Sequence, residues 1–378
     1  MTMTLTGLQP IIYEALDTVA NEPVGIINVV NKDANADTVA LNQTIRSYVT
    51  PAVTANDITP GVTPPNTGGQ ALSYIDLLIT KSRAIPVQWT GEEQKSVSNQ
   101  LTNIMRDQFA QAFRALRNEM EADLANALVA GASRAVGTAG TTPFGTQGDI
   151  SAAANVQQIL DDNGAPVGDR HLAVNTSTLA KLRSQGVLFK VNEAGTSDLL
   201  RNGVIGRLEG LDLHTSSALK LRTASTGSGY VTSGSTSAGS NSITLATGTG
   251  TINAGDVVAF QGDSNNYVAN VGVSAPGALT IGNPGLLTTV ATGKTATVTS
   301  AYTPNVAFHK NAIVLATRVP AMPAGGDAAT DVIEVLDPIS GITFQIAMYK
   351  MYRQVHIEVG AAWGTKVVKQ EFIGVLMG

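Results

Sequence analysis

The chain has 378 residues, of which 14% are charged and 43% are hydrophobic, and its formal net charge is −5. This composition excludes a disordered chain, because the hydrophobic content is high enough to form a core while the net charge is small. The charge is also too small and of the wrong sign for electrostatic nucleic-acid binding, and a chain without cysteine has no disulfides, thiolate zinc sites or cysteine nucleophiles.

The N-terminal residues predict an arm. Residues 1–10 lack the basic region and apolar core of a secretory signal. No run in the chain approaches the roughly eighteen consecutive apolar residues of a membrane span, so we expect no membrane partner and synthesis in the cytoplasm. An amphipathic segment follows at 11–19, and Asn21-Glu22-Pro23 ends it before a β-branched stretch at 24–30. Such an arm buries too little surface to be stable alone and needs a neighbour.

The next segment predicts a long hairpin. Residues 53–69 combine prolines and glycines with polar residues, which is typical of a turn-rich loop tip. Strand-like runs flank this tip at 44–50 and 72–89. Because a two-stranded hairpin is marginally stable alone in water, we expect this one to lie on another surface.

The strongest pattern in the chain predicts a helix over residues 90–132. Thr90 and Glu93 have the spacing of a capping box, apolar residues then recur at helical spacing, and Gly131 is a natural stop. Some forty residues would form a rod about 60 Å long. Charged residues occupy much of the remaining surface of this helix: Arg106, Asp107, Arg114, Arg117, Glu119, Glu121 and Asp123.

Residues 149–221 alternate between helical and strand patterns and predict a compact α/β layer. Helices are expected at 150–160 and 176–185, with a strand at 171–175 between them. A turn-rich stretch at 198–213 leads into a further strand.

The composition then changes sharply. Between Arg222 and Lys294 the only charged residues are Asp256 and Asp263. Short strand-like runs with close turns predict a small antiparallel barrel or sandwich, inserted into an α/β layer that resumes at 308–317. The Ser/Thr/Gly-rich run at 223–251 is interpreted as a loop that leads into a strand. The expected strands are 242–245, 257–260, 267–273, 278–281 and 295–299, with a weaker run at 288–291, followed in the tail by 332–336, 342–348, 354–359 and 366–369.

No pattern supports catalysis. The motif Asp33-x-Asn35-x-Asp37 resembles the start of a calcium loop, but Thr38 and Thr44 replace the required glycine and glutamate. Phosphate-binding, nucleophile-elbow and dinucleotide motifs do not occur. We therefore predict a protein that is not an enzyme and has no cofactor or metal site. The four histidines have no metal-ligand spacing and are interpreted as structural: His171, His214, His309 and His356.

The informative features are architectural. An arm, a projecting hairpin, a long helix and a strand-rich tail expose surface that one chain cannot bury, which is typical of a subunit that interdigitates with copies of itself. The low surface charge favours the same interpretation, because charge normally keeps monomers apart. An ordinary multidomain globular protein is the alternative.

In this order the parts resemble the major capsid protein of tailed double-stranded-DNA phages, whose fold is named after phage HK-ninety-seven. The passage NGVIGRLEGLDL at 202–213 resembles the turn-and-strand passage of the axial domain in such coat proteins. The resemblance implies an α+β fold with these parts: an N-terminal arm at 1–47, an extended loop at 48–89, a peripheral domain with a spine helix at 90–148, axial-domain segments at 149–221 and 305–330, an inserted β-barrel at 222–304, and C-terminal strands at 331–378.

The insertion narrows the resemblance. Residues 242–245, followed by AGDVVAF at 254–260, are similar to the inserted β-barrel of coat proteins from certain short-tailed phages. The low charge of this insertion departs from relatives that use dense charged pairs between neighbours, which puts its role in contacts across capsomers in question.

The resemblance implies an assembly mechanism. Hexamers and pentamers of one chain would tile an icosahedral shell in the virion, formed in the host bacterial cytoplasm. The partners implied are a scaffolding protein, a portal protein at one vertex, packaged double-stranded DNA bound without sequence specificity, and a decoration protein. Expansion on DNA packaging would reorient the N-terminal arm and the spine helix.

Two groups of contact residues follow from this assignment. The prolines of the loop tip pre-set backbone angles and lower the entropy lost when the loop docks. The candidates for contact between subunits are Asp57, Pro60, Pro64, Pro65, Arg106, Arg114 and Arg117. Three acidic residues of the arm are expected to face a basic scaffolding segment: Glu14, Asp17 and Glu22.

Two other functions stay open. An encapsulin-type compartment shell shares the fold, although an inserted barrel is uncommon there. An adhesin or surface-layer protein would account for the Ser/Thr/Gly-rich β region, but the long helix and the lack of a signal peptide argue against it.

Overall fold

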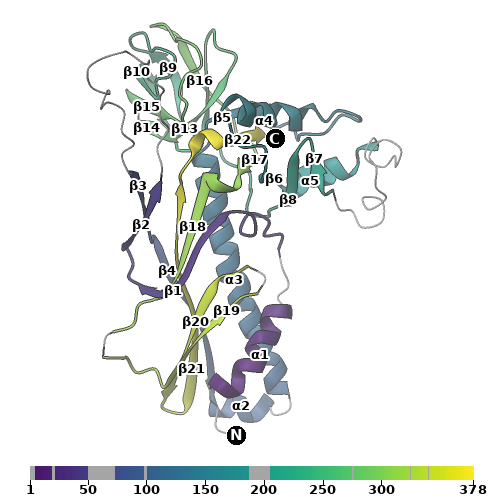
Figure 1. Cartoon of the computed structure of the whole chain (residues 1–378), viewed down its shortest axis with the longest axis vertical. Coiled ribbons are helices and arrows are strands. Elements are labelled where there is room, and N and C mark those ends of the chain that lie inside the picture. The colour runs from purple at the N-terminus through teal and green to yellow at the C-terminus, as the bar shows by residue number, and fades with distance from the viewer. Residues whose placement is uncertain are drawn as a thin grey trace, which may run out of the picture.

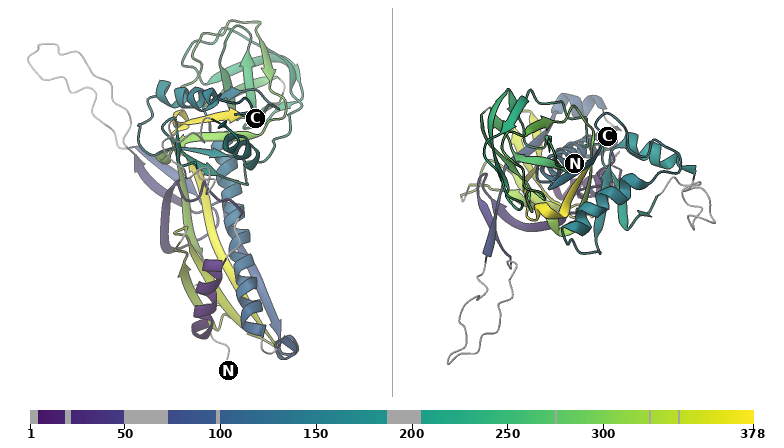
Figure 2. Two further views of the ribbon diagram at one scale, coloured as in Figure 1. Left: turned by 90° about the vertical axis from the view of Figure 1, so that its right-hand side faces the viewer. Right: turned by 90° about the horizontal axis from the view of Figure 1, so that it is seen from above.

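The computed structural model describes residues 5–18, 22–49, 73–97, 100–186, 205–274, 276–323, 325–338 and 340–378. The chain forms an elongated part, built on long strands and one long helix, and a head with a β-barrel and a layer of strands and helices (Figure 1). The long helix runs along the elongated part and ends in the head (Figure 2). The expected loop tip, with Asp57, Pro60, Pro64 and Pro65, lies outside the described residues.

A six-stranded sheet forms the elongated part, in the order β1-β18-β21-β20-β19, with β4 also paired to β21. The strand β21 is continuous, whereas the sequence predicted separate strands at 354–359 and 366–369. That prediction was wrong because small residues interrupt the β-branched pattern. One of these small residues, Gly364, lies where the chains pack closely: a Cβ there would be 2.0 Å from the Leu78 carbonyl oxygen. The bounds are β1 Asn31–Val39, β4 Lys81–Thr90, β18 Ile313–Pro320, β19 Asp331–Leu336, β20 Thr343–Met351 and β21 Gln354–Val367.

The expected helix at 90–132 is divided into α2 (Gly91–Val97) and α3 (Leu101–Ala130). The capping box is confirmed at the start of α2, where Glu93 N–H donates to Thr90 Oγ1 at 3.2 Å and Thr90 N–H donates to the Glu93 carboxylate at 2.8 Å. A single rod of forty residues was wrong: α3 has thirty residues, about 45 Å. Near the end of α2, Ser96 donates its hydroxyl to the Glu93 carbonyl oxygen at 2.9 Å, a type of side-chain bond that competes with the helical pattern.

The arm contributes a helix, a turn and a strand. The helix α1 (Leu5–Thr18) starts earlier than the amphipathic pattern predicted and packs on α3 with Leu8, Ile12 and Leu16 buried. The β-branched stretch at 24–30 forms a turn, and the polar segment after it forms β1, parallel to β18. The calcium-like motif therefore lies in a strand.

A closed antiparallel barrel of six strands occupies one end of the head, because β12 pairs with β13 at the end of the order β12-β16-β9-β10-β15-β13. Of the two architectures that the sequence predicted for the insertion, the closed pairing shows that it is a barrel and not a sandwich. The sequence missed β9 inside the Ser/Thr/Gly-rich run, and the run at 288–291 forms only a bridge between Val290 and Thr236. The strands are β9 Ser228–Thr232, β10 Ser242–Thr249, β12 Val257–Phe260, β13 Asn266–Val271, β15 Gly277–Ile281 and β16 Thr295–Val298; a small pair, β11 Thr251–Ile252 with β14 Val273–Ser274, lies beside them.

The same sheet continues from β13 into β5-β22-β17-β6-β8-β7, which we call the head sheet. The expected resumption of the layer at 308–317 holds for β17, which pairs with β6, but was wrong for β18, because the turn Lys310–Ala312 sends that strand into the six-stranded sheet. The bounds are β5 Arg134–Gly137, β6 Arg170–Val174, β7 Arg207–Leu208, β8 Leu211–Thr215, β17 Pro304–His309 and β22 Ile373–Met377, with α4 Ser151–Asp162, α5 Thr176–Arg183 and the turn Gln370–Phe372.

The barrel is joined to the end of α3 by specific contacts. Its strand β13 pairs with β5, directly after the helix. The Asn270 side-chain amide donates to the carbonyl oxygen of Ala130 at 2.7 Å, a group that has no partner within the helix. At Gly131 a Cβ would lie 2.6 Å from Val367 Cγ2, so only glycine fits where the helix ends. The barrel therefore closes the C-terminal end of α3.

Replacing Asn270 by Ala is expected to lower the free energy of unfolding by about 1–3 kcal/mol, because a carbonyl oxygen at the helix end loses its donor. Chemical denaturation followed by circular dichroism measures the change. Asn266→Ala, on the same strand, is the matched control because Asn266 has a main-chain pair with Ala135 that the substitution keeps. Equal stability of both variants would contradict a capping role for Asn270.

Candidate functional site: the arms and their anchor points

The base of the hairpin is ordered by paired strands. Strands β2 (Thr44–Val49) and β3 (Ser73–Leu78) form a separate antiparallel sheet. Arg46 lies opposite Asp76 and bonds its carboxylate at 2.9 Å, while the Arg46 guanidinium lies 3.7 Å from the centre of the Tyr74 ring. This cross-strand cluster fixes the register of the hairpin. Its exposed face is available to a neighbouring surface, since Tyr74 is 51% exposed.

A charged cluster ties β4, which follows the hairpin, to the long helix. Lys81 Nζ lies 2.9 Å from both the Glu119 and the Asp123 carboxylate. The second Asp123 oxygen accepts a hydrogen bond from Trp363 Nε1 at 2.8 Å. Burial alone would lower the pKa of Lys81, but the bonds to Asp123 and Glu119 outweigh it and the pKa is raised. The hairpin is thus anchored at its root.

The predicted arm acids and helix arginines contact one another within the chain. Arg106 pairs with Glu14 at 3.0 Å. Arg114 pairs with Glu22, which also accepts from the Asn118 amide, and these hydrogen bonds lower the pKa of Glu22 to about 2. The sequence assigned these residues to two different partners and did not foresee their pairing. Asp17 lies in α1, and its side chain is outside the described part of the chain.

Arg117 is buried, unlike the other two arginines. Its side chain is 3% exposed and forms an ion pair with the fully buried carboxylate of Asp337. Ser340 donates to the same carboxylate through its backbone N–H at 3.2 Å, and Lys32 Nζ donates to the Ser340 carbonyl oxygen at 2.6 Å. The cluster links α3, β1 and the turn after β19. Burial leaves Arg117 no surface for a neighbouring chain, so we do not carry it into the proposed contacts.

The sequence analysis also missed Glu121, which it placed among the charged residues of the helix surface. Glu121 is 1% exposed. Its carboxylate accepts hydrogen bonds from the backbone N–H groups of Ile26 and Ile27, at 2.9 and 2.8 Å, and from Ser216 Oγ at 2.6 Å. One side chain therefore connects the arm turn, the helix and the end of β8. Ala125 lies one helical turn after Glu121, on the same face of the helix, and is also buried. This spacing from a small apolar residue was the signal in the sequence that could have indicated burial of Glu121.

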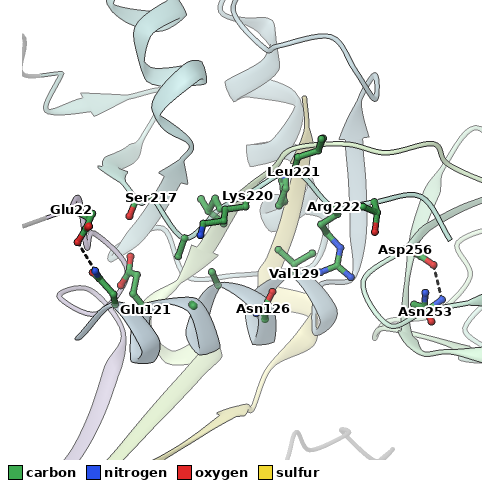
Figure 3. A pocket seen from close by; sticks show the side chains of 17 residues that line it. Glu22, Glu121, Asn126, Val129, Ser217, Lys220, Leu221, Arg222, Asn253 and Asp256 are labelled. Carbon is green, nitrogen blue, oxygen red and sulfur yellow. Dashed lines mark hydrogen bonds between the residues drawn. The ribbon is translucent and has the colours of Figure 1, made fainter. Parts of the chain in front are cut away.

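A hollow of about 570 Å³ lies beside this connection. Figure 3 shows Glu22 and Glu121 at one end of it and Arg222, Asn253 and Asp256 at the other. The hollow is bounded by the arm, α3, the segment 217–223 and the base of the barrel. It marks the joint where these parts meet.

Two histidines that sequence analysis treated as separate also meet. Register in the head sheet places His171 on β6 near His214 on β8, with Nδ1 and Nε2 3.2 Å apart. Burial lowers the pKa of both imidazoles. A neutral pair in which one ring donates and the other accepts fits this contact.

Comparison with known proteins adds information at the level of the fold. No protein-family model and no curated protein matches the chain. Among helices in the described ranges, none is long and apolar enough to cross a membrane.

Solved structures match over nearly the whole chain. The capsid structure of cyanophage P-SCSP1u is 12% identical, with 95% of this chain and 89% of that chain covered and a TM-score of 0.52. A structure of Mycobacterium phage Che8 is 16% identical, with 92% and 94% covered and a TM-score of 0.47. The capsid of Ralstonia phage GP4 is 9% identical, with 92% and 86% covered and a TM-score of 0.49. The cyanophage match confirms the expected α+β, HK-ninety-seven-like capsid fold, here with a closed six-stranded barrel.

Proposed function

We propose that the chain is the major capsid protein of a tailed phage, a structural protein whose hexamers and pentamers form the icosahedral shell around double-stranded DNA. The similarity to the cyanophage capsid structure, over 95% of the chain, carries this proposal. The anatomy supports it. The two-stranded sheet buries Leu77 against the elongated sheet but leaves its other face, with Tyr74, exposed, and a sheet of two strands is marginally stable by itself. Such parts are stabilised when copies pack together.

The proposed division of labour follows the parts of the chain. The head sheet with its helices, from 149–221 and β17, would meet its copies at capsomer centres. The elongated part, from 90–148 and 331–378, would bind neighbouring capsomers. The hairpin at 48–89 would reach over an adjacent subunit. The contact candidates are the tip residues Asp57, Pro60, Pro64 and Pro65 and the partly buried Arg106 and Arg114.

Further partners belong to the same proposal. A scaffolding protein, a portal protein at one vertex, a decoration protein and packaged DNA are expected from the resemblance to tailed-phage coat proteins. The inserted barrel favours a relationship to the coat proteins of short-tailed phages. The two acidic residues of the barrel do not favour ionic contacts with neighbouring subunits, because both are bonded within the barrel. Asp256 accepts from the Asn253 backbone N–H, and Asp263 accepts from Tyr267 and Thr288.

Electron microscopy of the high-mass fraction tests the proposal. The full chain is expressed alone and then with its genomic neighbours, and negative-stain images are recorded for each. Closed icosahedral shells, or sheets and spirals of hexamers, are expected. A monodisperse monomer under both conditions would overturn the proposal, and shells that enclose a cargo enzyme in place of DNA would favour the encapsulin-type alternative.

The arm acids give a second test. Reversing the charge of Glu14, Asp17 and Glu22 to Lys is expected to lower the yield of precursor shells made with the scaffolding protein. The reversal also breaks the pairs with Arg106 and Arg114, so the matched control replaces both arginines by Ala and keeps the acids. Contact with a scaffold predicts a large loss only for the acid variant. An unchanged yield, or an equal loss in the control, would contradict the assignment of these acids as the contact with the scaffolding protein.

A further inference from the structure

The turn at 24–30 is held between two parts of the molecule. On one side Ile26 and Ile27 donate their backbone N–H groups to the Glu121 carboxylate. On the other side Ser217 N–H donates to the Pro23 carbonyl oxygen at 3.0 Å. The arm therefore passes between α3 and the end of β8, and its main chain is hydrogen-bonded to both.

The fit of this passage is close. A Cβ on Gly25 would lie 2.6 Å from the Thr215 carbonyl oxygen, which only glycine avoids. Ser216, the next residue, pairs with Val24 in an isolated bridge and donates its hydroxyl to Glu121. The Glu121 carboxylate is the group that contacts both the arm and the end of β8.

We propose that Glu121 is the positioning residue of the N-terminal arm, with its carboxylate fixing the turn at 24–30 between the long helix and the head sheet. The donors on the arm are backbone groups, so the contact sets the path of the main chain. From the turn the chain runs back to Glu22, on Arg114, and forward into β1, whose first residue pairs with Val314. The position of α1 and β1 thus depends on this carboxylate.

The electrostatics make this contact responsive to ionisation. No lysine, arginine or histidine in the described ranges forms an ion pair with Glu121. Burial raises the pKa of its carboxyl, although hydrogen bonding to Ser216 and to the backbone at residues 25–27 opposes that shift. Its hydrogen-bond partners all donate, so the contact uses the carboxylate as an acceptor. The charged groups near the joint are Glu22 on the arm, Lys220 and Arg222 on the linking segment, Asp256 at the barrel and His214 on β8.

Hydrogen–deuterium exchange of the full chain tests the proposal. Glu121→Gln keeps the shape but replaces one acceptor oxygen by an NH₂ group that faces an N–H donor. Exchange of the peptide that contains Ile26 and Ile27 is expected to become about tenfold faster or more, since a hydrogen bond to a charged group is worth at least that factor. A peptide from β6 reports global stability in the same sample and is expected to keep its rate.

The controls separate positioning from general damage. Glu119→Gln makes the same chemical change two residues away, on the partly buried pair with Lys81, and is expected to leave the arm peptide unchanged. Ser216→Ala removes one donor and is expected to accelerate the same peptide less than Glu121→Gln; it replaces that variant if the latter does not fold.

Two results would overturn the proposal: unchanged exchange of the arm peptide in Glu121→Gln, or equal acceleration of the arm and β6 peptides. The consequence for shells rests on the proposed function, because a displaced arm would alter contacts between copies. The exchange measurement does not depend on assembly. A chain that shows the exchange result but never forms shells would therefore remove the proposed function and leave the role of Glu121 intact.

Discussion

Deleting residues 56–69 is expected to leave a folded subunit that no longer forms stable shells. The deletion removes the proline- and glycine-rich tip but spares the pairing of β2 with β3, from Thr44 opposite Leu78 to Val49 opposite Ser73. It also spares the anchor of Lys81 on Glu119 and Asp123. Closing the shortened loop changes the free energy of folding little, because loop-closure entropy varies slowly with length. Folding and assembly are thereby separated.

Circular dichroism and negative-stain microscopy on the same preparation measure both outcomes. The control keeps the loop length and replaces Pro60, Pro64 and Pro65 by Ala. Each substitution adds about 0.4–1 kcal/mol of chain entropy that docking must remove, so this variant is expected to assemble with a lower yield than the unmodified chain. Normal shells from the deletion variant would refute the assignment of 48–89 as the loop that binds a neighbour.

Replacing Arg117 by Met is expected to lower the free energy of unfolding by about 3–5 kcal/mol, because it leaves a buried carboxylate without its cation. The Asp337 side chain is fully buried, and hydrogen bonds from Ser340 remain to it after the change. The effect is expected to be among the largest of any single substitution, since most substitutions cost far less. Denaturant unfolding followed by the fluorescence of the two tryptophans measures it.

Two further variants decide the cause. Arg106→Met removes the same kind of side chain from the exposed pair with Glu14 and is expected to have a much smaller effect. The double variant Arg117→Met with Asp337→Asn removes both charges and is expected to recover part of the loss, because the remaining buried group is neutral. Equal losses from Arg117→Met and Arg106→Met would contradict a buried ion pair.

Much of the fold could be predicted because its signals are local. The capping box at Thr90 and Glu93, the helical spacing after it and the strand 257–260 depend on neighbours in sequence, and the structure has each of them. The order of these parts was enough to indicate the capsid fold that the cyanophage match supports. The same local pattern could not settle whether the inserted strands form a barrel or a sandwich, because that depends on whether β12 pairs with β13.

The burial and the partners of the charged residues could not be predicted from the sequence. Arg106, Arg114, Arg117 and Glu121 belong to one pattern of charges along the helix. The pattern predicts that all of them lie on its surface, and the three arginines were candidates for contact between subunits. In the structure Arg106 and Arg114 hold the acids of the arm, Arg117 holds Asp337 from 220 residues away, and Glu121 holds the backbone of the arm turn. The sequence by itself determined which segments become helices and strands and the order in which they follow, since these depend on periodicity. Only the tertiary structure decided which charges are buried and what they bind, because burial depends on segments far away in the chain that pack over the helix.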